Sequence, residues 1–499
     1  MRSSFILSLV ATALPLTAAN PLPQQSTSKP KDIQSCLNAA KVPITVQSSA
    51  DWSADIRPYN TRLAYTPSIV VTATDPKHVQ DTVKCGFALG LKVTARGGGH
   101  SYSSSGLGGE NNHVVIRLDE MFAVKLNSDN TATIQAGARL GHVAIELFNQ
   151  GGRAISHGSC PGVGTSGHSL HGGFGFSSST YGLATDWIVE ATVVLANGTV
   201  AKASQTQNPD LFWALRGAGS SFGIVTEFKF NTFEAPDVVT TFKVPFNLNQ
   251  SKLADALVAL QKYAQNDKPT ELNMRAVITP GDTHFDGLYF GSASQARSVL
   301  QKFLSANSKL GINLNGATIT ATDWIGQLEY YAGQELDQTG PQDAAESFYA
   351  SSLMTTVVPD AGFKNFADFY FNKAKSFQSG WFVLVDVHGG KNSKVSQAVP
   401  SSSYAHRDKV LMWQFYNADY SGAATYSRDN IKFMQDWMSR VSSTLVQPWG
   451  RYANYPDTEL SSVAAQEQYY MGSLARLRTV KKQLDSKNVF AYPQGITLV

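Results

Sequence analysis

Two glycine-rich stretches carry the most reactive side chains of the sequence. "RGGGHSY" covers residues 96–102 and contains His100, and "HGSCPGVG" covers residues 157–164 and contains Cys160. A thiol and an imidazole can form a nucleophilic pair, bind a metal ion or bond to a cofactor. The surrounding glycines are typical of backbone that turns tightly or lies close to a large ligand.

Several kinds of site could use these side chains, and the residues alone leave them open. The N–H groups of Gly97–Gly99 could bind an anion, yet no Walker motif is present, and no GxGxxG opens a helix with a suitably placed acidic residue. A reactive thiolate would be oxidised in a secreted protein, and an inert Cys160 could pack as a small apolar side chain. We predict no metal site, because HExxH and CxxC spacings are absent from the candidates His100, His157, His168, His171 and Cys160. A cofactor bonded to both His100 and Cys160 is the fourth possibility.

The N-terminus predicts export. "MRSSFILSLVATALPLTAAN" combines an arginine, an apolar run and small residues, which is typical of a secretory signal peptide over residues 1–19. No other run is long and apolar enough to span a membrane, so we expect no membrane contact. Export implies an oxidising compartment, where three cysteines allow one disulfide. A bridge between Cys36 and Cys85 would tie the N-terminal tail to a following helix and leave Cys160 over.

Composition indicates a globular protein of at least two domains. The chain has 499 residues, of which 42% are apolar and 16% are charged, and this length exceeds one ordinary core. The net charge is +3, without a run of five like charges. We therefore expect neither nucleic acid nor an anionic membrane as a partner. Asn197 and Asn249 begin glycosylation sequons, which agree with secretion.

The elements that must position His100 and Cys160 are readable from local patterns. Residues 69–72 predict a strand, Asp75 and Pro76 begin a helix with apolar residues at Val79, Val83 and Phe87, and residues 92–95 predict a second strand. This is the pattern of a βαβ unit. Further strands are expected at 113–119 and 131–137, a helix over 138–152, and a hairpin turn at Asn197-Gly198.

The second half of the chain has a different pattern. Residues 234–446 alternate strand-like runs with helical ones, which predicts an antiparallel sheet covered by helices. The tail predicts one helix over 467–485 and a strand-like segment over 488–496. The fold class is therefore α+β.

Three motifs in this order carry a resemblance to a known family. "RGGGHSY" (96–102), "HGSCPGVGTSGHSLHGGFGFSSSTYGLATDWI" (157–188) and "RYANYPD" (451–457) resemble the berberine-bridge-enzyme-like branch of the vanillyl-alcohol-oxidase flavoprotein superfamily. Within that branch, the sequence is most similar to the fungal secreted oligosaccharide oxidases. The resemblance implies a two-domain vanillyl-alcohol-oxidase-type fold. Residues 30–232 and 447–499 would form the FAD-binding domain, and residues 233–446 the substrate-binding domain.

The resemblance also implies how the cofactor is held. The family binds FAD bicovalently, so His100 would carry the flavin 8α-methyl group and Cys160 the C6 position. The family also has an N-terminal disulfide, which the pair Cys36 and Cys85 fits. Val163, three residues after Cys160, resembles the oxygen-reactive members, which favours an oxidase. The other expected cofactor-binding residues are Arg96, Gly97, Gly98, Gly99, Ser101, Gly158, Gly164, Gly167, His168, Gly172, Gly173, Ile224, Tyr452 and Asn454.

The implied reaction is a two-electron oxidation of an alcohol. By resemblance, Tyr455 would be the general base for the C1 hydroxyl of a reducing-end sugar, and Asp386 is our candidate for its partner. An unperturbed tyrosine is a poor base at neutral pH, so it needs such a partner or a positive flavin environment. Hydride would pass to the flavin, the lactone would leave, and oxygen would be reduced to hydrogen peroxide.

The expected substrate contacts are fewer. Tyr102 and Gln414 match positions where the family contacts substrate. Arg275, on the strand-like run 274–278, would suit a C2 hydroxyl better than an acetamido group. Gluco-, cello- or xylo-oligosaccharides are therefore expected over chitin fragments. Some aromatic side chains could stack on sugar, although most are expected in the core: Trp324, Tyr330, Tyr331, Trp381 and Trp413.

The overall expectation is an extracellular, monomeric oxidase with an oligosaccharide and O2 as partners. Three alternatives remain open on the sequence. The chain could be a berberine-bridge-like oxidase of a secondary metabolite, a sugar dehydrogenase that uses another electron acceptor, or a non-catalytic lectin or inhibitor.

Overall fold

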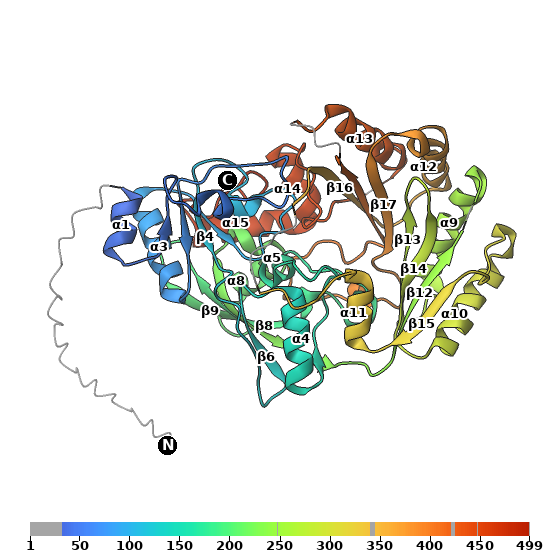
Figure 1. Ribbon diagram of the computed structural model, residues 1–499, viewed down its shortest axis with the longest axis horizontal. Coiled ribbons are helices and arrows are strands. Elements are labelled where there is room, and N and C mark those ends of the chain that lie inside the picture. Colours follow the sequence, from blue (N-terminus) through green and yellow to red (C-terminus); the bar gives the residue numbers. More distant parts are fainter. Residues whose placement is uncertain (1–31, 247, 340–344, 421–424, 447, 499) are drawn as a thin grey trace, which may run out of the picture.

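The computed structural model describes residues 32–246, 248–339, 345–420, 425–446 and 448–498. The predicted signal peptide, residues 1–19, lies outside the described residues. Figure 1 shows two bodies side by side, one holding the N-terminal strands and the other a broad antiparallel sheet. Helices and antiparallel sheets together confirm the α+β prediction.

The first sheet contains the predicted strand–helix–strand unit. In the described chain its order is β1 (Ile44–Thr45), β2 (Ile69–Thr72), β4 (Val114–Arg117) and β3 (Val93–Arg96). β2 and β3 both pair with β4 in parallel, so β4 lies between the two predicted strands. Helix α3 (Pro76–Leu89) begins where the Asp75 carboxylate accepts the Lys77 N–H and ends at Gly90, whose φ is +70°. A disulfide joins α1 (Ile33–Ala39) to α3 through Cys36 and Cys85, as predicted.

The second sheet is antiparallel and packs beside the first. Its order in the described chain is β5 (Val124–Leu126), β6 (Thr131–Gln135), β10 (Ile224–Asn231), β8 (Ile188–Val194) and β9 (Val200–Ser204). The predicted hairpin joins β8 and β9, where Gly198 has a φ of +79° that a side chain would disfavour. The predicted helix is α4 (Leu140–Gly151), which packs against β5, whereas α8 (Pro209–Ala218) packs against β8 and β9.

The third sheet forms the second body. Its order in the described chain is β15 (Thr318–Thr322), β12 (Val239–Pro245), β14 (Thr283–Tyr289), β13 (Leu272–Ile278), β17 (Gly380–Val387), β18 (Leu411–Ala418) and β16 (Phe348–Thr355). Neighbouring strands run antiparallel, as predicted. Helices cover its outer face in Figure 1, and they are α9 (Gln250–Asn266), α10 (Ala293–Ala306), α12 (Asp360–Asn372) and α13 (Arg428–Ser442).

The aromatic side chains of this body lie mostly in the core, as expected. Trp413 is fully buried, and Trp324 and Trp381 are 1% and 4% exposed. Tyr331 donates its hydroxyl to the carbonyl of Gly287, and Tyr330 is exposed. Strands place alternate residues on opposite faces of a sheet. The helices cover one face, and the other face is turned toward the first body (Figure 1).

The C-terminal tail returns to the first body. α14 (Ser462–Tyr470) and α15 (Leu474–Leu484) pack into the same core as β2 and β10. The single predicted helix over 467–485 is wrong, because Met471 has a φ of +42° that breaks it. The strand-like segment over 488–496 is also not a strand, although the Val489 carbonyl accepts the Val93 N–H at 2.8 Å. Asn488, with a φ of +58°, and Pro493 interrupt an extended course.

Each body has its own core. The first draws on residues between 37 and 230 and between 465 and 496, and the second on residues between 242 and 441. Which ligand each part binds, and the predicted boundaries at 232 and 446, stay predictions. The remaining short elements are α2 (Trp52–Asp55), β7 (Arg153–Ala154), α5 (Thr165–Leu170), α6 (Ser178–Tyr181), α7 (Ala184–Trp187), β11 (Phe233–Glu234) and α11 (Trp324–Ala332).

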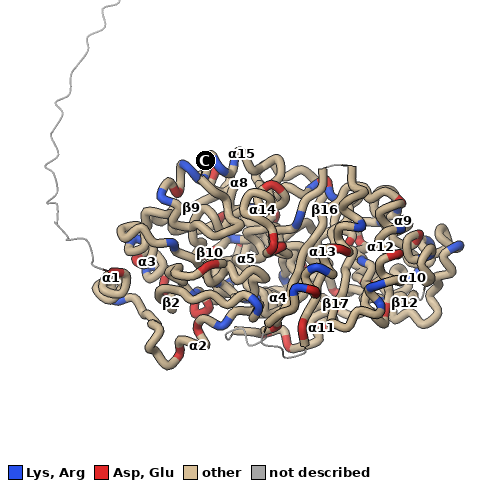
Figure 2. Tube along the Cα trace, turned by 90° about the horizontal axis from the view of Figure 1, so that it is seen from above, with Lys and Arg blue, Asp and Glu red and all other residues tan. Residues whose placement is uncertain are grey.

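Charges are mixed over the molecule. Figure 2 shows Lys and Arg interspersed with Asp and Glu along the trace. Within the described residues, none of the helices is both long enough and apolar enough to cross a bilayer.

Candidate active site

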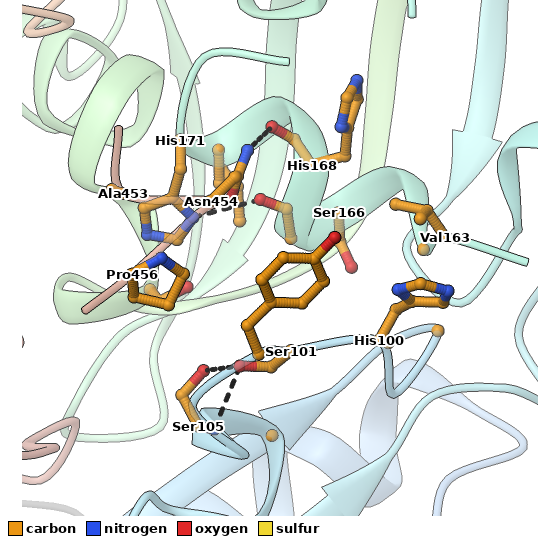
Figure 3. Close-up of a pocket in the computed structure, with 18 of the residues that line it drawn as sticks. His100, Ser101, Ser105, Val163, Ser166, His168, His171, Ala453, Asn454 and Pro456 are labelled. Carbon is orange, nitrogen blue, oxygen red and sulfur yellow. Dashed lines mark hydrogen bonds between the residues drawn. The ribbon is translucent and has the colours of Figure 1, made fainter. Parts of the chain in front are cut away.

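A cavity of about 380 Å³ lies where the two bodies meet. The glycine-rich loops of the first body, the inner face of the seven-stranded sheet and the C-terminal tail all contribute to its wall. Figure 3 shows part of this wall, and His100, Val163, His168 and Asn454 are among the lining residues labelled in it. The predicted site residues that line the cavity are Arg96, Gly97, Gly98, Gly99, His100, Ser101, Tyr102, Gly158, Cys160, Val163, Gly164, Gly167, His168, Ile224, Arg275, Asp386, Gln414, Asn454 and Tyr455.

Glycine is required where the two loops touch each other. A Cβ on Gly98 would lie 2.3 Å from the backbone nitrogen of Gly164, and a Cβ on Gly164 would lie 2.2 Å from that of Gly98. Real Cβ atoms do not approach backbone so closely, so only glycine allows the loops to pack in this way. The result is a smooth backbone cradle with little side-chain bulk.

Arg139 clamps the two loops and was not predicted from the sequence. Its buried guanidinium donates from Nη1 to the carbonyls of Gly98 and Gly162, both at 2.6 Å. Hydrogen bonds from a charged donor are the stronger kind, so Arg139 fixes the relative position of His100 and Cys160. It belongs to no motif, and no signal in the sequence could have found it.

His100 and Cys160 are neighbours, although 60 residues separate them. Cys160 Sγ lies 3.6 Å from His100 Nε2. The imidazole of His100 stacks on Tyr59, with 3.8 Å between ring centroids and 26° between planes. Desolvation lowers the pKa of His100 to about 4, so the ring is neutral and keeps a nucleophilic nitrogen lone pair. Tyr59 comes from the loop before β2, which the sequence did not connect with His100.

Some predicted cofactor residues brace the wall. Tyr452 accepts the N–H groups of Gly173 and Phe174 at 3.0 and 3.1 Å. Gly172 packs against the rings of Tyr404 and Tyr452. Gly172, Gly173 and Tyr452 therefore lie behind the lining residues and do not form the wall themselves.

Arg96 and Asn454 line the cavity and also make structural hydrogen bonds. The Arg96 guanidinium donates to the carbonyls of Asp55 and Arg57, at 2.5 and 3.0 Å, which turns the charge toward the protein. Asn454 donates to the carbonyl of His168 at 3.1 Å (Figure 3) and to the Tyr452 hydroxyl.

The inner face of the sheet carries a row of charged side chains. Arg275 on β13 lies opposite Asp286 on β14 and opposite Asp386 on β17. Residues directly opposite each other point to the same face of a sheet, so the three side chains form one line. Desolvation raises the pKa of Asp386 to about 7, against the opposing effect of Arg275. Asp386 can therefore change its charge near neutral pH.

Tyr455 is held at the cavity by the neighbouring strand β16. The Tyr455 carbonyl accepts the Ser352 hydroxyl at 3.0 Å, and a buried ion pair of Arg451 and Asp457 closes the surrounding segment at 3.0 Å. The Tyr455 ring lies nearly parallel to Tyr102, with 5.8 Å between centroids. Desolvation, together with the charges of Tyr102 and Asp386, raises the pKa of Tyr455 well above its ordinary value.

The other predicted substrate residues lie in the same wall. Gln414 on β18 donates to the Tyr102 hydroxyl at 3.2 Å, which fixes both side chains. Within the described residues, no group of three or more His, Cys, Asp or Glu side chains is arranged to hold a metal ion. A phenol and a carboxylate at a desolvated wall are suited to moving a proton.

The residues present fit an FAD cofactor. A bulky, flat ring needs close backbone and little side-chain volume, and the Gly98–Gly164 contact provides such a cradle. A neutral imidazole and a thiol side by side are chemically able to bond to one ring system.

Comparison with known families agrees with this fit. The family model described as "FAD binding domain" matches residues 67–204, which include both glycine-rich loops. The family model described as "Berberine and berberine like" matches residues 451–497, which include Tyr455.

Individual relatives are similar over nearly the whole chain. A xylooligosaccharide oxidase from Thermothelomyces thermophilus is 41% identical, over 98% of this chain and 98% of its own length. A chitooligosaccharide oxidase from Gibberella zeae is 40% identical, over 94% of this chain and 95% of its own. A solved structure of the glucooligosaccharide oxidase from Acremonium strictum, described as holding 6-S-cysteinyl, 8α-N1-histidyl FAD, superposes with a TM-score of 0.89. It is 39% identical and covers 94% of this chain and 99% of its own.

Identity of this extent is decisive for both fold and cofactor. The two-domain fold is of the vanillyl-alcohol-oxidase type, and the cofactor is FAD. The chain belongs to the berberine-bridge-enzyme-like family of FAD-dependent carbohydrate oxidases.

Proposed function

We propose that this protein is a secreted oligosaccharide oxidase that holds FAD through His100 and Cys160. The observation that carries the proposal is the 3.6 Å contact of these two side chains in a cavity that Tyr455 and Asp386 also line. One end of the site thus has two groups able to bond to a flavin, and the same cavity has a pair able to move a proton.

The proposed substrate is the reducing-end sugar of a gluco-, cello- or xylo-oligosaccharide. Its C1 hydroxyl is oxidised to the lactone, and O2 is reduced to hydrogen peroxide. Relatives named for xylo- and glucooligosaccharides support this class. Arg275 donates hydrogen bonds to Asp286 from Nε and Nη2. Its Nη1 therefore remains available to bind a hydroxyl at C2 of the sugar. A guanidinium in that position disfavours the bulkier acetamido group of chitin fragments.

Tyr455 and Asp386 divide the proton transfer between them. Because desolvation raises the pKa of Tyr455, its phenol is neutral before substrate binds and cannot act as a preformed base. Tyr455 accepts the proton of the C1 hydroxyl as its own proton passes to Asp386, whose pKa of about 7 leaves it partly ionised at neutral pH. Such transfer contributes about 10²- to 10⁴-fold in rate.

The remaining residues orient the reacting groups. Gln414 and Tyr102 form a fixed polar edge for the sugar, and Arg139 holds the two glycine-rich loops in register. When bound, FAD supplies the two-electron acceptor and its reoxidation by oxygen. Val163 lines the cavity three residues after Cys160, and we assign it to the path of oxygen.

Secretion is part of the proposal. The N-terminal sequence supports it, although residues 1–19 lie outside the described residues. The disulfide between Cys36 and Cys85 fits an oxidising compartment. We propose a monomer in solution.

Peroxide release by the purified protein tests the function. We expect peroxide with cellobiose, maltose or xylobiose, and much less with diacetylchitobiose. Bleaching of the flavin by sugar without peroxide in air would indicate a dehydrogenase. If none of the sugars bleaches the flavin anaerobically, the proposal is overturned in favour of a secondary-metabolite oxidase.

A further inference from the structure

Asp286 is a buried carboxylate next to the proposed catalytic pair, and it is not among the residues that line the cavity. Asp286 is 7% exposed. It lies on β14, directly opposite Arg275 on β13, and Arg275 is in turn opposite Asp386 on β17. Asp286 and Asp386 therefore stand on either side of one arginine.

The arginine is not shared equally between the two carboxylates. Arg275 donates to Asp286 with both arms of its fork, from Nε at 2.8 Å and from Nη2 at 3.1 Å. This bidentate arrangement is the strongest geometry for an arginine and a carboxylate. The ring of Phe176 lies 4.6 Å from the centre of the guanidinium and restricts its movement. Asp386 acts on Arg275 only through its charge.

Lys243 on β12 is also directly opposite Asp286, but its Nζ pairs with Asp282 at 2.8 Å. The remaining described groups around this row do not supply a second cation. His284, also on β14, lies 4.0 Å from Asp286, and desolvation lowers its pKa, so it is neutral. Tyr331 from α11 and Tyr455 from the tail face Arg275, and desolvation raises the pKa of both phenols. Among the described residues, Arg275 is therefore the one cation that can stabilise both buried carboxylates, and its two hydrogen bonds go to Asp286.

We propose that Asp286 is a positioning residue that keeps the fork of Arg275 away from Asp386 and so makes Asp386 basic enough to accept the proton of Tyr455. A carboxylate that receives a bidentate arginine is a poor proton acceptor, because its anion is stabilised. With the fork committed to Asp286, the proton can leave the Tyr455 oxygen for an Asp386 oxygen as Tyr455 takes the proton of the C1 hydroxyl. Asp386 then gives up its proton when O2 is reduced to hydrogen peroxide, which resets the pair. The proposal rests on the proposed function of Tyr455 and Asp386.

Asp286→Asn tests it through the pH profile. The substitution removes the competing charge and frees the fork, and both effects make Asp386 more acidic. We expect the acid limb of the rate of anaerobic flavin reduction to move down by about one pH unit. The plateau rate at high pH should fall several-fold, since the Asp386 anion is then a weaker base. An acid limb at its wild-type pH in a folded, yellow variant would overturn the proposal.

Two variants separate position from charge. Asp282→Asn removes the same charge from the turn of the same hairpin, where Asp282 pairs with Lys243 and His284 and does not touch Arg275. We expect its acid limb to stay at the wild-type pH, and an equal shift in both variants would contradict a role for the fork. Asp286→Glu keeps the charge and should retain a limb near the wild-type pH. If the Asp286→Asn protein does not retain flavin, Asp286→Ser, which also removes the charge, takes its place in the same measurement.

A stability measurement needs no substrate and so separates this inference from the proposed function. The difference in Tm between wild type and Asp386→Asn, followed over pH, reports the ionisation of Asp386 in the folded protein. In the Asp286→Asn background, that difference should still begin at about pH 4, where the carboxyl of the unfolded chain ionises, but it should level off about one pH unit lower and at a smaller value. An unchanged levelling-off pH overturns the inference. If no sugar reduces the flavin while this pH moves, the proposed function fails and the effect of Asp286 on the ionisation of Asp386 stands.

Discussion

The phenol of Tyr455 and the carboxylate of Asp386 share one physical difficulty. Desolvation raises the pKa of each, so before substrate binds Tyr455 is protonated and only part of Asp386 is ionised at neutral pH. A pair can still move a proton when the substrate hydroxyl completes the chain, because no isolated charge then has to form on Tyr455. Removal of either member should therefore affect the chemical step and leave the cofactor in place.

Tyr455→Phe should retain FAD and lose most of its reactivity toward sugar. The ring remains to pack on Tyr102, whereas the proposed proton acceptor is removed. We expect anaerobic flavin reduction to slow by about 10²- to 10⁴-fold in stopped-flow measurements. A rate near that of the wild type would place the base elsewhere.

Asp386→Asn should stabilise the protein at alkaline pH while it impairs catalysis. The folded-state pKa of Asp386, about 7, lies above its ordinary value because of desolvation. The carboxyl therefore favours the folded state at low pH, and this contribution is lost as pH rises through about 7. The variant's Tm should match the wild type near pH 4 and exceed it by a few degrees at pH 8. A Tm difference independent of pH would argue against a desolvated carboxyl.

At the scale of elements, the conformation of the two glycine-rich loops depends on the direct contact between their backbones at Gly98 and Gly164. Gly98→Ala would put a Cβ 2.3 Å from the Gly164 backbone, and backbone cannot yield as a flexible side chain does. We expect a lower Tm and loss of the yellow colour after purification.

Gly281→Ala is the matched control. A Cβ at Gly281 would meet nothing within 4 Å, so flavin content and Tm should remain those of the wild type. Equal flavin content in Gly98→Ala and Gly281→Ala would show that the loop contact is not needed.

Elements with strong local signals could be predicted from the sequence, and contacts between distant segments could not. The helix after Asp75 and the turn at Asn197-Gly198 follow from capping and from glycine's freedom at positive φ. The break at Met471 lies beside Gly472 and Ser473, a local signal that the prediction of a single helix did not use. The row of Arg275 and its two carboxylates depends on strand order and register across residues 275, 286 and 386. Tyr59 and Arg139 were missed for the same reason, since each reaches the site from a separate segment.

At the scale of the whole molecule, the cavity lies where two separate cores meet. Such a site needs both bodies to hold their positions, and the C-terminal tail contributes by packing into the first core while it presents Tyr455 to the cavity. The disulfide lies at the far end of the first body, away from the second (Figure 1).

Loss of this disulfide should lower stability without altering the chemistry. Cys36 and Cys85 close a loop of 49 residues, for which the loss of chain entropy on cross-linking is worth about 2–4 kcal/mol. In a chain of this size we expect Cys85→Ser to lower Tm by a few degrees. The rate of flavin reduction should not change, and a large change would mean that the N-terminal tail influences the site.

The double attachment of the cofactor is tested most directly by peptide mapping of the purified, digested protein by mass spectrometry. We predict that one FAD cross-links the peptide that contains His100 to the peptide that contains Cys160. In Cys160→Ala, FAD should remain attached to the His100 peptide alone. Recovery of both peptides without added mass would contradict the account, because the 3.6 Å contact between those side chains would then serve another purpose.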